Sequence, residues 1–319
     1  MEWRPTADIP TLRQRATLLD AARQFFRDRS VLEVETPVVL SHTVTDVQLE
    51  SLQLTGHPPR FLQTSPEYPM KRLLAAGSGD IFQVCHALRA GDRSRLHNPE
   101  FTLIEWYRLG FRLPAIMAET AELAGWLLQC AGHDRRPTEF LRYNDAFRRE
   151  LDCDALDTPL EILAARSADC GLALQSIAGA SRNDLLDFLI ATQVGPRLGQ
   201  GKLTCLHHFP ASQASLAQLD PQDPRTALRF ELYADGIELA NGYVELASSI
   251  EQQQRFAADH AERGRRGLAQ PAMDPRLLAA LTHGLPACAG VAMGFDRVAM
   301  LALNAPDIDA VMAFPWERA

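Results

Sequence analysis

One stretch restricts the fold of this chain more than any other. It consists of Arg89, a short polar loop, and a segment from Phe101 to Tyr107 in which apolar residues predominate. An arginine fork can bridge a carboxylate and a phosphate, and the ring of Phe101 offers a flat apolar face to a planar base. Glu105 and Tyr107 can reach a bound ammonium. This order of side chains predicts a loop and a strand that hold ATP against an amino acid.

The composition is that of an ordinary folded protein. The chain has 319 residues, of which 46% are apolar and 23% charged. This is enough to build a large core, and it gives no sign of global disorder. The net charge of −8 argues mildly against a long nucleic-acid contact, because such a contact usually needs a basic face.

Targeting and cysteine patterns point to the cytoplasm. The first eight residues contain no apolar signal segment, and no apolar run reaches the roughly 18 residues that a membrane span needs. The six cysteines are widely spaced and include no C-x-x-C pair. We therefore expect a cytoplasmic protein with reduced thiols, without a membrane span, a zinc site or a disulfide framework.

Hydrophobic periodicity predicts an α+β fold. Apolar spacings of three and four predict helices, alternation predicts strands, and Asp235-Gly236 predicts a hairpin turn. The predicted helices are 11–29, 115–130, 252–263, 275–283 and 297–303, with 134–200 mostly helical. The predicted strands are 31–35, 81–84, 101–107, 230–233, 237–239 and 291–293. We find no repeat or low-complexity linker, so we expect one domain over residues 1–319, an antiparallel sheet flanked by helices.

The segment after Arg89 resembles motif 2 of the class II aminoacyl-tRNA synthetases, in their lysine-specific branch. The resemblance covers about residues 10–319 and implies that Arg89 binds the α-phosphate of ATP and that Phe101 stacks on adenine. It also implies ATP contacts from the intervening loop, namely Gly91, Asp92, Arg95, His97 and Asn98. One departure concerns adenine: the family usually has Arg-x-Glu, whereas here Asp92 lies one position later and is one methylene shorter. Adenine could instead be read by backbone groups near Gly91.

A second resemblance lies upstream, at residues 65–73. This segment is similar to the Pro-Glu-Leu-Tyr-like segment of the lysyl enzymes, which supplies a carboxylate near the substrate's amino group. It implies that Ser65 and Glu67 contact the substrate, together with Glu105 and Tyr107. An ammonium that leaves water needs an opposite charge and hydrogen bonds.

A third resemblance lies at residues 236–246, the region that binds Mg²⁺ in this family. It implies that Glu238 and Glu245 are Mg²⁺ ligands, that Glu238 and Leu239 contact ATP, and that Asn241 and Glu245 contact the substrate. Mg²⁺ takes hard oxygen ligands and is usually bound through one or two carboxylates plus substrate phosphates.

The spacing of these two glutamates needs an irregularity. They are an odd number of residues apart, so a regular strand would place them on opposite faces. The dipeptide Asn241-Gly242 lies between them. We therefore expect a bulge or turn at that dipeptide, which would bring both carboxylates to one side.

Residues 290–297 resemble motif 3. The resemblance implies that Arg297 lies over adenine opposite Phe101 and acts in catalysis with Arg89, while Gly294 lets the backbone approach the nucleotide. Ala292 stands where lysyl-tRNA synthetases have glycine. One methyl group in a tight pocket discriminates between substrates by about 1–3 kcal/mol, so Ala292 is a candidate specificity residue.

Within the lysine branch, the chain is most similar to a truncated paralogue family that modifies elongation factor P with (R)-β-lysine. About ten residues precede the predicted first helix, too few for the OB-fold that reads the anticodon, so we expect no anticodon-dependent tRNA binding. The helix at 11–29 and the strand at 31–35 resemble motif 1, which implies a homodimer. Two alternatives stay open: an α-lysine ligase that acts on tRNA or another acceptor, and a non-catalytic synthetase-like regulator.

Overall fold

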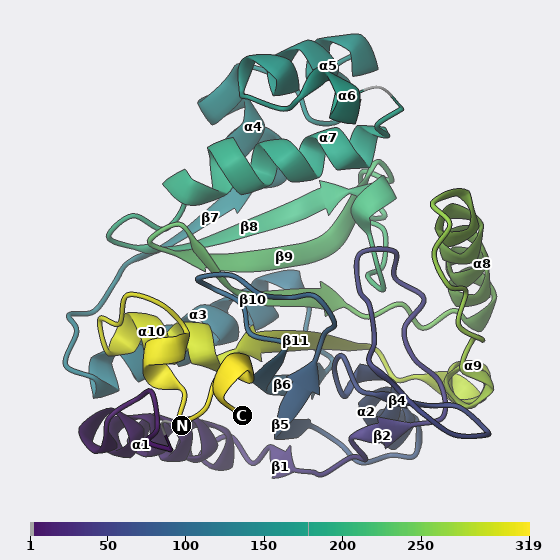
Figure 1. Ribbon diagram of the computed structural model, residues 1–319. Helices are drawn as coiled ribbons and strands as arrows, with labels where there is room; N and C mark the ends of the chain where they lie inside the picture. The colour runs from purple at the N-terminus through teal and green to yellow at the C-terminus, as the bar shows by residue number, and fades with distance from the viewer. Residues whose placement is uncertain (1–2, 178) are drawn as a thin grey trace. The chain divides into compact units, whose positions relative to one another are not determined.

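The computed structural model describes residues 3–177 and 179–319 and divides the chain into two compact units. The first unit comprises the chain up to Arg112 together with Glu122–Arg135 and Glu245–Ala319. The second comprises Leu113–Ala121 and Arg136–Val244. Each unit contains both strands and helices, as the α+β prediction requires (Figure 1).

The first unit is built on four strands in the order β1-β5-β6-β11. β1 runs parallel to β5, whereas β6 is antiparallel to both β5 and β11. A separate small sheet has the order β2-β4-β3. The strands of this unit are β1 (Leu32–Glu33), β2 (Val39–Leu40), β3 (Gln53–Leu54), β4 (Arg60–Leu62), β5 (Ile81–Leu88), β6 (Glu100–Leu109) and β11 (Cys288–Gly294).

Helices account for much of the rest of this unit. α1 begins after Asp8, whose carboxylate accepts a hydrogen bond from the backbone of Thr11 at 2.8 Å, the expected form of an N-cap. The helices are α1 (Ile9–Arg27), α2 (Glu67–Ala75), α8 (Ser249–Arg265), α9 (Pro275–Gly284) and α10 (Phe295–Ala302), and the division between the units falls within α3 (Leu113–Cys130). In the described part of the chain, none of the helices has the length and apolar character that a bilayer crossing requires.

One face of β5 and β6 packs on α1. The rings of Phe26 and Phe82 stack with centroids 4.4 Å apart, and Trp106 lies 5.4 Å from Phe26, all three fully buried. Side chains alternate across a strand, so Glu105 and Tyr107, the neighbours of Trp106, belong to the opposite face. The core therefore determines which face of β6 is left for the predicted site.

The second unit has four strands in the order β10-β9-β8-β7. β7 (Thr138–Arg142) runs parallel to β8 (Leu203–Pro210), while β9 (Thr226–Ala234) is antiparallel to both β8 and β10 (Ile237–Val244). The predicted turn between the last two strands is confirmed, because Asp235 and Gly236 both have positive φ, as a type I′ hairpin requires. Because β1–β5 and β7–β8 are parallel pairs, the strand pairing in each unit is mixed, and not wholly antiparallel as had been predicted.

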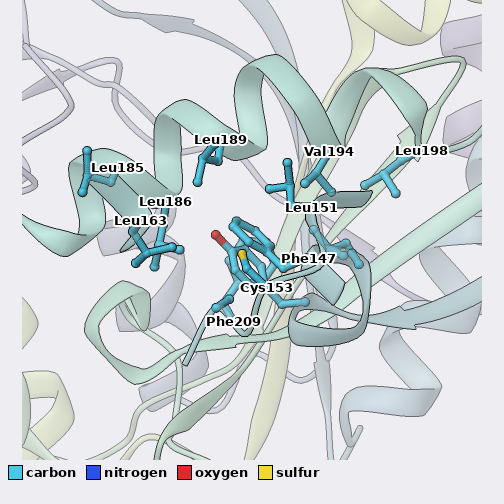
Figure 2. Close-up of a cluster of buried hydrophobic side chains, with 14 of the residues drawn as sticks. Phe147, Leu151, Cys153, Leu163, Leu185, Leu186, Leu189, Val194, Leu198 and Phe209 are labelled. Atoms are coloured by element: carbon cyan, nitrogen blue, oxygen red, sulfur yellow. The ribbon is translucent and has the colours of Figure 1, made fainter. Parts of the chain in front are cut away.

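The core of the second unit lies among its helices. These are α4 (Tyr143–Leu151), α5 (Leu160–Asp169), α6 (Leu174–Ile177) and α7 (Arg182–Leu189), the last continued by a π-helical turn. Figure 2 shows the leucines of α7 gathered near Phe147 within a buried apolar cluster. The expectation of a mostly helical 134–200 is confirmed, but it missed the strand β7, and the sequence reading did not identify β8 at all.

Candidate active site

A pair of polar side chains lies on the face of β6 that is turned away from α1. The hydroxyl of Tyr107 donates to Oε1 of Glu105 at 2.8 Å, and both residues are almost fully buried. In the antiparallel ladder with β11, Gly290 lies opposite Tyr107 and Ala292 lies opposite Glu105. The resemblance implies that Glu105, Tyr107 and Ala292 contact the substrate, and strand register brings these three residues together.

The environment of Glu105 favours its neutral form when no cation is bound. Burial, followed by the charge of Glu67, raises the pKa of Glu105 to about 8, against the lowering effect of the Tyr107 hydroxyl. Its second oxygen, Oε2, is buried and has no hydrogen-bond partner among the described residues. An unsatisfied buried carboxylate oxygen is suited to receive a donor, and an ammonium is the donor that would also restore the charge.

Two further carboxylates meet at a buried lysine. The ammonium of Lys71 lies 2.6 Å from Oε1 of Glu67 and 2.6 Å from Oε2 of Glu245, and the lysine side chain is 1% exposed. Glu67 begins α2, where its backbone N–H donates to Oγ of Ser65 at 3.1 Å. Burial alone would lower the pKa of Lys71, but Glu245 and Glu67 outweigh burial and raise it, so the lysine is charged.

Glu245 also accepts from the backbone N–H of Gly290. There is no room for a side chain at Gly290, since a Cβ there would stand 2.5 Å from Oε1 of Glu245 and 2.4 Å from the ring of Tyr107. With Lys71 and Gly290 as partners, Glu245 is already engaged on the amine side of the site. This arrangement favours its predicted role in substrate binding over its predicted role as a metal ligand.

Sequence reasoning missed Lys71. One signal could have found it: Lys71 follows Glu67 by four residues in a predicted substrate segment, the spacing of a helical ion pair. It is also one of only two lysines in the chain. The contact with Glu245, 174 residues away, leaves no trace in local sequence.

Motif 2 places its arginine beside its aromatic residue. The guanidinium carbon of Arg89 lies 5.0 Å from the ring centroid of Phe101, within the range of a cation–π contact. Nε of Arg89 donates to the carbonyl of Thr64 at 3.4 Å, next to the predicted substrate residue Ser65. Arg89 therefore connects the two segments that the resemblance assigned to ATP and to the amino acid.

His97 links motif 2 to motif 3. Its Nε2 lies 2.6 Å from Nη2 of Arg297, and its Nδ1 lies 2.7 Å from Oγ of Ser94. A guanidinium only donates, so Nε2 must accept and Nδ1 must carry the ring proton. Nε of Arg297 also donates to the carbonyl of Leu96 at 3.2 Å. Arg297 thus holds the loop between Arg89 and Phe101, the predicted ATP loop, which has a turn at Gly91 with φ +78°.

The C-terminal segment fastens the same loop. Oδ1 of Asn98 accepts from the backbone of Trp316 at 3.0 Å, and the carbonyl of Arg95 accepts from Ile308 at 3.0 Å. Nη1 of Arg95 donates to the carbonyl of Pro306 at 3.1 Å. These contacts fix the positions of Arg95 and Asn98, two of the predicted ATP contacts, whereas Gly91 is exposed and Asp92 is half-buried.

In the second unit the predicted bulge is present, but its expected position was wrong. The register of β10 against β9 shifts between Glu238 and Ala240, so Leu239 is the extra residue, and Asn241 and Gly242 pair regularly. A bulge reverses the alternation of side chains beyond it. Accordingly, Arg229 is influenced by the charge of Glu238 and also donates to Oδ1 of Asn241 at 3.3 Å.

Arg229 is a second residue that sequence reasoning missed. Its Nη2 lies 2.6 Å from Oε1 of Glu231, whose other oxygen accepts from the hydroxyl of Tyr233 at 2.6 Å. Asn241 in turn donates to the hydroxyl of Tyr243 at 2.9 Å. This partly buried network orients Asn241, a predicted substrate contact, through Arg229. The alternating pattern Arg229-x-Glu231-x-Tyr233 was its only sequence signal.

Comparison with known proteins agrees with these motifs. The model of the family "tRNA synthetases class II (D, K and N)" matches residues 3–318. Proteins from Salmonella paratyphi A, Salmonella dublin and Salmonella enteritidis PT4, each named elongation factor P--(R)-beta-lysine ligase, are 47% identical to this chain over 326 residues. Each alignment covers 99% of this chain and 98% of the relative.

Proposed function

Because this chain belongs to the class II (D, K and N) tRNA synthetases, and within them to the family of elongation factor P--(R)-beta-lysine ligases, we propose that it activates (R)-β-lysine with ATP and ligates it to elongation factor P. The observation that carries this proposal is the buried pair of Glu105 and Tyr107, which can bind a substrate ammonium and which we call the amine receptor. Nearby, Lys71 holds Glu67 and Glu245. A substrate with ammonium groups and one free carboxylate matches the negative charges of this carboxylate cluster and the positive charge of Arg89.

The first step is adenylate formation. A carboxylate oxygen of the amino acid attacks the α-phosphorus of ATP in line, a new P–O bond forms, and the bond to the β,γ-pyrophosphate breaks. Arg89 neutralises charge that develops on the α-phosphate. Arg297 and His97 hold the predicted ATP loop between Arg89 and Phe101. Catalysis of this kind depends on orientation and on preorganised charge.

The second step is transfer. The ε-amine of a lysine on the acceptor attacks the carbonyl carbon of the acyl-adenylate, an amide bond forms, AMP leaves, and the amine gives up a proton. A thiol of this chain is not needed as an intermediate carrier. Burial raises the pKa of Cys85, Cys205 and Cys288 to about 12, which leaves these thiols unreactive at neutral pH.

Mg²⁺ is part of the same proposal. Glu238 is a carboxylate on the partly exposed side of β10 and provides the oxygen ligand type that Mg²⁺ takes. Among the described residues, no group of three or more His, Cys, Asp or Glu side chains is arranged to hold a metal ion. We propose that the phosphates of ATP supply the other ligands. When bound, the ion would neutralise phosphate charge. Glu245 is assigned to the amine pocket.

A homodimer is also proposed, from the motif 1 resemblance. Three apolar side chains in and near β1 and β2 support it, since Leu32, Val38 and Val39 are between 39% and 55% exposed. Exposed apolar side chains become buried when a partner chain covers them. Light scattering of the purified protein tests the proposal, and a monomer at micromolar concentration would contradict it.

The experiment that tests the function records products on two acceptors. The protein is incubated with ATP, Mg²⁺, (R)-β-lysine and elongation factor P, and the intact mass of the factor is measured, with a parallel reaction that offers bulk tRNA. We expect a mass gain of one lysyl unit on the factor and no charged tRNA. Charged tRNA with an unmodified factor would instead support the α-lysine or minimal-synthetase alternative.

ATP–pyrophosphate exchange separates the enzyme from a non-catalytic regulator. We expect (R)-β-lysine-dependent exchange in the wild type and none in Arg89→Ala, because the variant loses the cation beside the α-phosphate. Exchange near the wild-type rate in Arg89→Ala would remove Arg89 from the mechanism. A wild-type protein without exchange would favour the regulator.

A further inference from the structure

Lys71 is an ammonium built into the protein interior. It lies in the first turns of α2 and is 1% exposed. It contacts Glu67 of the same helix and the distant Glu245, each at 2.6 Å. Lysine is almost never fully buried unless it is paired. Here the pairing is double, so Lys71 fixes one oxygen of Glu67 and one oxygen of Glu245.

Glu105, the third carboxylate of the cluster, has a different kind of partner. It receives a neutral hydroxyl from Tyr107, while its Oε2 is buried without a hydrogen-bond partner among the described residues. The three carboxylates are close enough for their charges to affect one another. Without an internal cation, such a cluster would offer an incoming ammonium several competing positions, each with unbalanced negative charge nearby.

We propose that Lys71 is a positioning residue for the ligase reaction: its ammonium locks Glu67 and Glu245 in place and leaves Glu105 with Tyr107 as the open receptor for a substrate ammonium. This inference rests on the proposed function, because it concerns how the amino acid is bound. It assigns Lys71 no contact with ATP. Loss of Lys71 should therefore weaken amino-acid binding and spare nucleotide binding.

Two variants test the role of the charge. Lys71→Met keeps much of the side-chain volume but removes the ammonium, and Lys71→Ala leaves a space that matches n-propylammonium. In ATP–pyrophosphate exchange we expect the KM for (R)-β-lysine to rise about tenfold or more in both variants, with the KM for ATP within about twofold of wild type. A Lys71→Met protein with the wild-type KM for the amino acid would overturn the proposal.

Chemical rescue distinguishes charge from packing. Added n-propylammonium should lower the amino-acid KM of Lys71→Ala, whereas tetramethylammonium, which lacks an N–H donor, and 1-propanol, which lacks a charge, should not. Lys202→Ala is the matched control, because Lys202 is the other lysine and pairs with Glu139 at 2.8 Å on the surface; it should show no rescue. Equal rescue by 1-propanol would reduce Lys71 to a packing role.

A thermal measurement covers the case in which Lys71→Ala is unfolded at the assay temperature. The Tm of the variant should then rise with n-propylammonium and not with 1-propanol, and the same Tm in both would overturn the proposal. The wild-type protein keeps the two proposals separate. If it shows no exchange with (R)-β-lysine, the proposed function fails, whereas the Tm comparison still reports on the Lys71 site.

Discussion

Ala292 lies directly opposite Glu105 in the antiparallel pair of β11 and β6. Its methyl group therefore stands on the site face of the sheet, beside the carboxylate whose second oxygen is open. Ala292 is partly exposed, whereas its strand neighbours Val291 and Met293 are buried on the other face. A residue in this position can change the depth of the pocket without altering its charges.

Ala292→Gly should move the substrate preference toward α-lysine. Removal of one methyl group is worth about 1–3 kcal/mol in a tight pocket, so the ratio of kcat/KM values for the β and α isomers should change about tenfold or more. The ratio is measured by ATP–pyrophosphate exchange with each isomer. Ala289→Gly is the control, because Ala289 lies on the opposite face of the same strand. An unchanged ratio in Ala292→Gly would refute the pocket argument.

Gly290→Ala should disable the amine pocket. The new Cβ would stand 2.4 Å from the ring of Tyr107 and 2.5 Å from Oε1 of Glu245, so both side chains must move. A misplacement of about 1 Å can cost about 10²-fold in rate, and we expect a loss of that order in kcat/KM for (R)-β-lysine.

Gly264→Ala is the matched control for this substitution. Its Cβ would meet only the far end of the Gln270 side chain, which can move, and alanine favours a helix. The control should keep full activity and stability. A Gly290→Ala enzyme with wild-type kcat/KM would show that Tyr107 and Glu245 are not needed at their observed positions.

The raised pKa of Glu105 makes a prediction about stability and pH. The pKa is about 8 in the folded protein, above its ordinary value of 4.5, so the folded state holds a proton that the unfolded state has lost between these two values. The free energy of unfolding therefore falls as the pH rises through this window. Glu105→Gln lacks this ionisable group and should not show the fall. The free energy of unfolding of the variant minus that of wild type should therefore increase by at least about 1 kcal/mol from pH 5 to pH 8.

Denaturant unfolding at the two pH values measures this difference. Glu100→Gln is the control, because Glu100 lies on the same strand but is 44% exposed and contacts His86 at the surface. The control should show little change in the difference between the two pH values. If Glu105→Gln behaves like Glu100→Gln, the buried carboxyl ionises normally and the amine receptor is not neutral when empty.

Local pattern explains which parts of the site could be predicted. Trp106 alternates with Glu105 and Tyr107, and a period of two is enough to separate a core face from a site face. The hairpin turn at Asp235-Gly236 was equally visible, because that dipeptide is suited to positive φ. These features depend on neighbours in sequence, and the structure confirms the strand and the turn.

The remaining features depend on distant partners or on residues without a signature. The contact of Lys71 with Glu245 joins segments 174 residues apart. The bulge lies at Leu239, an apolar residue with no turn preference, and not at Asn241-Gly242, where the turn residues had suggested it. Similarly, β7 is a five-residue strand that gains its hydrogen bonds from β8, about 65 residues later.

Arg93→Met should weaken ATP binding selectively. Arg93 lies in the ATP loop between Arg89 and His97, and it forms two hydrogen bonds with Asp309, at 3.0 Å and 2.6 Å, and one with Glu317 at 2.6 Å. These contacts hold the loop to the C-terminal segment, residues 306–317. The same segment contacts Arg95 and Asn98, two of the predicted ATP-binding residues. We expect the KM for ATP to rise up to about fivefold, since partly exposed pairs are worth about 0.2–1 kcal/mol.

The KM for (R)-β-lysine should stay near the wild-type value in Arg93→Met, and the effect on ATP should shrink at high salt, which screens exposed pairs. Arg225→Met is the matched control: Arg225 likewise forms two hydrogen bonds with Asp223 and one with Asp157, but it lies in the second unit, outside the ATP loop. An equal change in both variants would point to a general loss of stability. A rise confined to ATP in Arg93→Met would identify the C-terminal segment as the support that positions the nucleotide loop.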